Sequence, residues 1–259
     1  MYHPFSIIET IKSAWDVLKK NYISLIIYSI ITLVLYQFIS ILTSLFYFTD
    51  NLYSKMVVVL FMMLVQSYLT LSFYKLILTL IHKEYYEFEF KDIVPTFKMA
   101  LNFVSVALAF VILIGVVILI NFFLRENTTL MFVLDKVEIL SLAYLLIRSV
   151  FCLCFIVDDD SGPFEALVQS FRITKNNFFK LVAIILIVFL FIAILLLIIN
   201  GVITLFISEE SKSMAYVLKI AGIVWFAISF PTVQVMIMTT YKRLVYSHQD
   251  VDDDIAETN

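Results

Sequence analysis

The chain has 259 residues, of which 62% are hydrophobic and 15% are charged, and its mean hydropathy is +1.00. A soluble domain has about 45–50% apolar and about 25% charged residues, so this composition excludes an ordinary soluble protein and indicates a membrane protein. The net charge of −3 comes without a dense basic cluster, which argues against a nucleic-acid partner.

Residues 1–22 predict a helix at the membrane surface and not a cleaved signal peptide. They lack an early basic region and a small-residue cleavage site. Apolar residues recur at helical spacing up to Trp15 and Leu18, while Lys19 and Lys20 lie mostly on the opposite face. This pattern is typical of an amphipathic interfacial helix, with the tryptophan at the level of the lipid headgroups.

Six apolar stretches are long enough to cross a hydrocarbon core of about 30 Å as helices. Helices are favoured over barrel strands because the runs are long and unbroken and every backbone polar group must be paired inside lipid. The sequence therefore predicts an all-α polytopic membrane domain over residues 1–246, built as three hairpins, followed by a polar acidic C-terminal tail over 247–259. The predicted spans are residues 22–48, 56–82, 102–124, 138–157, 178–207 and 214–242.

The distribution of Lys and Arg predicts the orientation of these spans. Basic residues gather at one set of span ends, in residues 12–20, 83–98, 172–180 and 242–243. The opposite side has fewer, namely Lys55, Arg125, Lys136, Lys212 and Lys219. Because basic loops stay in the cytoplasm, we expect both termini there.

The charged segment 158–181, DDDSGPFEALVQSFRITKNNFFKL, predicts a second amphipathic helix and an internal repeat. Its apolar face is formed by Phe164, Leu167, Val168 and Phe171, and its polar face includes Arg172 and Lys175. At one constant offset of 156 residues it matches the start of the chain, with Glu9 on Glu165, Trp15 on Phe171, Lys19 on Lys175, and Asn21 on Asn177.

A weaker copy of the same pattern covers residues 91–101. The chain is thus predicted to consist of three units, 1–83, 84–160 and 161–246, each with an interfacial helix followed by a hairpin. The alternative is that these matches reflect only the periodicity that any six-span protein shows.

One family resemblance rests on the same segment. Its features are the acidic cluster, Gly162-Pro163, Glu165-Ala166-Leu167, Ser170, and Lys175-Asn176-Asn177 at the entry to a span. They resemble an uncharacterised bacterial six-span membrane family related to the membrane domain fused to some glycerophosphodiester phosphodiesterases. No phosphodiesterase domain is present, so the resemblance implies a multi-pass protein of the bacterial cytoplasmic membrane and not that activity.

Arg148 is the main candidate for a binding residue, because it falls inside the predicted fourth span. A central Arg costs about 2.5–3.5 kcal/mol on insertion scales. No Asp or Glu falls in the interior of a predicted span, so its partner is either a neutral polar side chain or an anionic ligand, such as a lipid phosphate. If the partner is an anionic ligand, Arg148 joins Lys75 and Lys242 in a basic pocket. If it is a neutral polar side chain, the Lys75 side chain simply extends to the membrane interface.

Catalytic chemistry is poorly supported. No zinc-binding His pair, nucleophile elbow or phosphate-binding loop occurs, and Cys152 and Cys154 point to different sides of a helix. We predict no catalytic residue, metal or cofactor, and a non-enzymatic envelope accessory, scaffold or lipid-interacting factor. The partners expected are the bilayer and an anionic lipid or small anion. The alternatives are a transporter or exporter of a small anionic or amphiphilic molecule and, with less support, an enzyme acting on lipid phosphates.

Overall fold

The molecule is an all-α integral membrane protein, as the composition predicted. Six helices are long and apolar enough to cross a membrane, and the secondary structure in the described part of the chain is helical. The computed structural model describes residues 5–44, 51–82, 90–124, 128–206 and 214–257.

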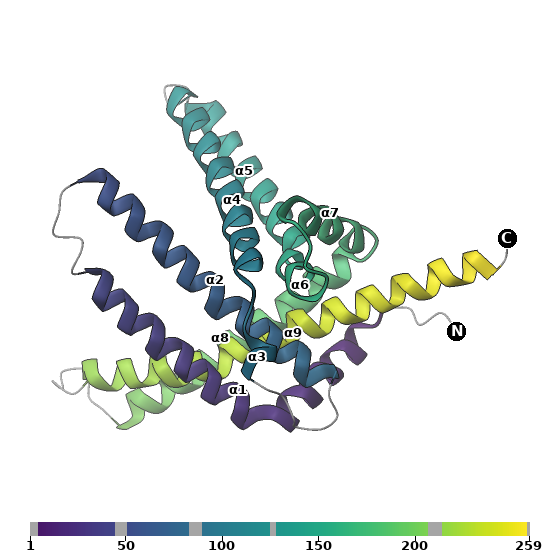
Figure 1. The fold of residues 1–259 in the computed structure, drawn as a ribbon. Helices are drawn as coiled ribbons and strands as arrows, with labels where there is room; N and C mark the ends of the chain where they lie inside the picture. Colours follow the sequence, from purple (N-terminus) through teal and green to yellow (C-terminus); the bar gives the residue numbers. More distant parts are fainter. Residues whose placement is uncertain (1–4, 45–50, 83–89, 125–127, 207–213, 258–259) are drawn as a thin grey trace.

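The six spans form three helical hairpins, which confirms the predicted hairpin order. The pairs are α1 (Ile7–Ser44) with α2 (Leu52–His82), α4 (Phe97–Leu124) with α5 (Thr128–Ser149), and α8 (Phe178–Phe206) with α9 (Met214–Glu257). Figure 1 shows the hairpins leaving a common base in three different directions. Three shorter helices lie at the base: α3 (Phe90–Ile93), α6 (Cys152–Asp158) and α7 (Pro163–Thr174).

Packing is concentrated at this base, which we call the hub. It consists of residues 5–29, 67–81, 93–106, 148–185 and 227–245. Among the described residues outside the hub, only Thr43, Val58 and Ile203 are buried. The apolar side chains of the diverging span halves therefore face outward, where lipid takes the place of a protein core.

The first predicted interfacial helix and the first span form one bent helix, α1. The bend lies at Asn21, whose φ and ψ are −118° and 18°. Its side-chain amide donates to the Val17 carbonyl at 3.0 Å, so it competes for the acceptor that a regular helix would offer to the Asn21 backbone N–H. In the third unit the chain turns at residues 175–177, between α7 and α8. The two breaks fall at positions that the proposed repeat aligns.

The prediction of a weaker copy of the interfacial helix over residues 91–101 is wrong, because no continuous helix covers them. The helix α3 ends at Ile93 and α4 begins at Phe97. Pro95 lies between them, where it has no N–H to donate and keeps the preceding Val94 out of the α region.

Two other boundaries differ from those expected. The predicted fourth span, 138–157, is interrupted at residues 150–151, between α5 and α6. The expected C-terminal tail from residue 247 begins inside α9, which continues to Glu257.

Candidate functional site

Arg148 lies in the last turn of α5, where the fourth span is interrupted. Its side chain is buried, with 8% exposed. An Nη2 hydrogen donates to the Phe171 carbonyl at 2.6 Å, and the guanidinium lies 5.1 Å from the centre of the Phe171 ring and 5.7 Å from that of Tyr144. Phe171 is in the last turn of α7, so the cation lies at the carbonyl ends of two helices, where the dipoles favour it.

Ser170 joins the same interruption to α7. Its hydroxyl donates to the Arg148 carbonyl at 2.7 Å and accepts from the Phe151 N–H at 3.2 Å. These are backbone groups that the break between α5 and α6 releases from regular helical pairing. A buried backbone group without a partner is costly, so Ser170 allows the span to be interrupted.

Lys75 also binds a backbone carbonyl. Its Nζ donates to the Val94 carbonyl at 3.0 Å, in the short link between α3 and α4. This contact joins the first hairpin, through α2, to the link between α3 and α4. The Lys75 side chain therefore does not simply extend to the membrane interface, because it binds a group of the protein.

Lys242 forms an ion pair with Asp158, at the end of α6. Its Nζ lies 2.9 Å and 3.2 Å from the two carboxylate oxygens, and the Tyr241 hydroxyl donates to the same carboxylate at 2.9 Å. The two charged side chains are 13% and 17% exposed, so the pair is largely withdrawn from solvent. Thus Lys75, Arg148 and Lys242 each bind a group on a different element, and their common anion pocket stays a prediction.

Three of the basic contacts, unlike that of Lys242, follow the order of the three predicted units. Lys75 of the first unit binds the link between α3 and α4 in the second, and Arg148 of the second binds α7 of the third. Arg243 of the third unit donates to Glu9 at 3.0 Å and to Ser13, both in α1. These contacts close the hub into a ring that joins α9 back to α1. Sequence spacing did not reveal Asp158, Tyr241 or Arg243, because each partner is distant in the chain.

The predicted interfacial residues lie on the surface of the hub. Trp15 is 58% exposed, Lys19, Lys20, Arg172 and Lys175 are also exposed, and Phe171 is half-buried against Arg148. The helix α7 packs through Ala166, Ser170, Ile173 and Thr174, which leaves Phe164 82% exposed. At the aligned positions of α1, Thr10 and Ala14 are likewise fully buried and Ile8 is 79% exposed. Both helices thus pack through small residues and present larger apolar ones outward.

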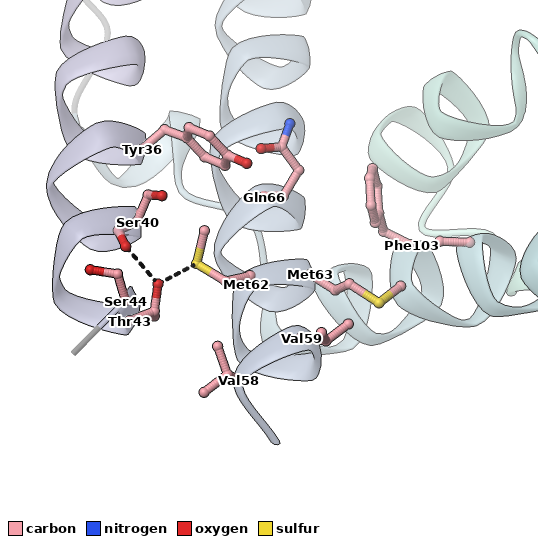
Figure 2. A pocket seen from close by; sticks show the side chains of 11 residues that line it. Tyr36, Ser40, Thr43, Ser44, Val58, Val59, Met62, Met63, Gln66 and Phe103 are labelled. Atoms are coloured by element: carbon pink, nitrogen blue, oxygen red, sulfur yellow. Dashed lines mark hydrogen bonds between the residues drawn. The ribbon is translucent and has the colours of Figure 1, made fainter. Parts of the chain in front are cut away.

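A groove of about 580 Å³ lies along the first hairpin, from near the hub to the far end of α1. The lining residues come from α1, α2 and the start of α4: Tyr36, Ser40, Thr43, Ser44, Val58, Val59, Met62, Met63, Gln66, Phe103 and Ala107. Figure 2 shows the polar side chains of α1 facing Met62 and Gln66 of α2, and Met63 on the side of α2 nearer Phe103. The sequence signal was available, since Tyr36, Ser40 and Thr43 form a polar stripe at helical spacing inside an apolar span.

No family model, curated protein or solved structure matches this chain. The resemblance of residues 158–181 to the bacterial six-span family stays a prediction. Within the described ranges, no group of three His, Cys, Asp or Glu side chains is placed to hold a metal ion.

Proposed function

We propose that the protein is a non-enzymatic, lipid-interacting factor of the bacterial cytoplasmic membrane. The observation that carries this proposal is the groove between α1 and α2 in the diverging half of the molecule. A groove inside the bilayer that also contains hydroxyl and amide groups is suited to an amphiphile rather than to a small ion.

The contacts of the basic residues support lipid binding over an anion pocket in the hub. Arg148 and Lys75 donate to backbone carbonyls, and Lys242 is paired with Asp158. An anion bound by Lys75 or Lys242 would have to displace these partners, and the released carbonyl and carboxylate would then be left without theirs. The buried Nε of Arg148 has no hydrogen-bond partner among the described residues, so an acceptor could bind there without displacing the Phe171 carbonyl.

A second candidate is export of an amphiphilic molecule. Pro231 lies inside α9, at the place where this helix enters the hub. A proline within a span is a common position for a bend or hinge, and movement there would change the distance between hairpins. Uptake or release of a fluorescent amphiphile by liposomes that contain the protein would favour this candidate over simple binding.

The first test is native mass spectrometry of the full chain extracted from bacterial membranes in mild detergent. We expect retained lipid in the wild-type protein and equal retention in the Lys75→Ala and Arg148→Ala variants. Loss of the retained lipid in either variant would favour the basic pocket instead. A wild-type protein that retains no lipid under conditions that preserve its fold would contradict the proposal.

A further inference from the structure

The groove between α1 and α2 has a mostly apolar lining with several uncharged polar side chains in it. From α1 come Tyr36, Ser40, Thr43 and Ser44, which lie about one helical turn apart along the face toward α2. None of the 11 side chains that line the groove carries a charge. A charged headgroup would therefore lose its hydration there without gaining a counterion.

Two of these polar groups have hydrogen-bonding capacity that no described residue fills. Gln66 is exposed, and its one hydrogen bond to a described residue is a donation to the Thr70 hydroxyl at 3.3 Å. An amide has two donor hydrogens and an acceptor oxygen, so most of its capacity is unused. The Tyr36 hydroxyl has no hydrogen bond to any described residue, and Figure 2 shows both side chains extending into the space between α1 and α2.

The unfilled hydrogen-bonding capacity of Gln66 is costly at this depth in the membrane. Gln66 lies in α2, about 20 Å along the helix from its start at Leu52 at ~1.5 Å per residue, so it is far from the end of the span. Water is not available in the hydrocarbon region to fill this capacity. An amide group without a hydrogen bond there is less stable by several kcal/mol than one with a partner. A ligand that offers both a donor and an acceptor would remove this cost.

We propose that this groove binds one uncharged amphiphile, a lipid whose head carries a hydroxyl, ester or amide group. The head lies against Gln66 and Tyr36, and its hydrocarbon chain runs past Met62 and Met63, whose flexible thioethers adapt to irregular apolar shapes. The volume of about 580 Å³ is within the usual range for small-molecule sites. The inference rests on the proposed function, because it names the class of lipid that the protein binds.

The experiment titrates the detergent-solubilised full chain with two lipids and follows binding by native mass spectrometry. Dioleoylglycerol is the uncharged probe, and dioleoylphosphatidylglycerol has the same chains with an anionic head. The test variant is Gln66→Leu, and the matched control is Gln37→Leu, because Gln37 is an exposed glutamine of α1 that does not line the groove. Tyr36→Phe serves as a second test variant, with the exposed Tyr216→Phe as its control.

We expect a one-to-one complex with dioleoylglycerol and weaker binding of the anionic lipid. Loss of one hydrogen bond predicts roughly three- to tenfold weaker binding of dioleoylglycerol by Gln66→Leu, with no change in Gln37→Leu. Thermal unfolding of each variant checks that it is folded. Should Gln66→Leu be unfolded, the pair Tyr36→Phe and Tyr216→Phe decides the outcome.

The other outcomes overturn the inference in different ways. Equal or stronger binding of the anionic lipid contradicts an uncharged ligand. Binding of dioleoylglycerol that is the same in Gln66→Leu and Gln37→Leu contradicts this site but leaves the proposed function intact. A wild-type protein that binds neither lipid contradicts both. A dimer that is lost in Gln66→Leu and is insensitive to dioleoylglycerol would identify the groove as an interface between copies.

Discussion

At the scale of single residues, Arg148 has several partners within the protein, although its buried Nε has no hydrogen bond to a described residue. Its guanidinium donates to the Phe171 carbonyl and lies over the rings of Phe171 and Tyr144. A charged hydrogen bond contributes about 1.5–3 kcal/mol, and a desolvated cation–π contact about 2 kcal/mol. These contacts offset the cost of a cation inside a membrane protein.

Arg148→Ala is therefore expected to destabilise the protein by about 2–4 kcal/mol, since it removes both kinds of contact. The stability of Arg148→Lys should lie between those of Arg148→Ala and the wild type, because an ammonium group keeps the charge but lacks the planar guanidinium geometry. Thermal unfolding in detergent, followed by tryptophan fluorescence, measures the difference, with the exposed Lys219→Ala as control. An unchanged Tm for Arg148→Ala would point back to a ligand-binding role for this residue.

Asp159 is a residue whose charge opposes folding. Partial burial raises the pKa of its carboxyl, the neighbouring Asp158 raises it further, and Lys242 acts in the opposite direction. The folded protein therefore holds this proton more tightly than the unfolded chain. Between the unfolded and the folded pKa the native state binds more protons, so the free energy of unfolding falls as the pH rises through that window.

Asp159→Asn should accordingly raise the Tm at neutral pH, because it removes a carboxylate that is less stable in the folded state. The gain should shrink as the pH falls and vanish below the ordinary carboxyl pKa of 3.8, where the wild-type side chain is protonated in both the folded and the unfolded state. Thermal unfolding of both proteins across that pH range tests this. A difference in Tm that does not change with pH would mean that shape, and not ionisation, is responsible.

At the scale of elements, the position of α7 depends on the interruption between α5 and α6. Ser170 bonds both the Arg148 carbonyl and the Phe151 N–H, and Arg148 in turn bonds the end of α7. The helix thus stabilises the break in the span, and the break supplies the groups to which the helix docks.

Ser170→Ala should cost about 1–3 kcal/mol, because two buried backbone groups lose their partner while little volume changes. The measurement is again the Tm in detergent. Ser105→Ala is the matched control, since the Ser105 hydroxyl is exposed and bonds only its own helix, at the Leu101 carbonyl, 2.9 Å away. Equal Tm values for the two variants would contradict the role given to Ser170.

The elements also show which features the sequence could predict. Long apolar runs identified all six spans, because length and hydropathy alone decide whether a helix can cross lipid. The start of α7 at Pro163 followed from proline's suitability for a first turn. The interruption at residues 150–151 has no local signal, since neither Gly nor Pro is present there, and it depends on Ser170 from a later helix.

The candidate site was less predictable, because it also depends on contacts between residues that are distant in the sequence. Arg148 stood out because a charge inside a span is rare, but its partner is a backbone carbonyl, which carries no sequence signal. The acidic partner of Lys242 is Asp158, 84 residues away, and the partner of Arg243 is Glu9, 234 residues away. Helical spacing describes only neighbours within one element, so it could not pair these charges.

At the scale of the whole molecule, the hub and the diverging hairpins have different tasks. The hub contains nearly all buried side chains and the ring of contacts from Lys75, Arg148 and Arg243. The diverging halves have few protein contacts, so lipid composition should affect them more than it affects the hub. Lipid binding in the groove of the first hairpin is therefore compatible with a hub that stays folded.

The final prediction concerns the orientation of the hub. The excess of Lys and Arg near the hub predicts that it faces the cytoplasm and that Ser44, at the far end of α1, lies near the opposite surface. In intact bacterial cells, a membrane-impermeant maleimide should label Ser44→Cys, whereas Asp16→Cys should react only after the cells are permeabilised. The wild-type protein is the control, because Cys152 and Cys154 are buried and should react little. The reverse pattern would invert the orientation, and labelling of both variants in intact cells would contradict a span between the two positions.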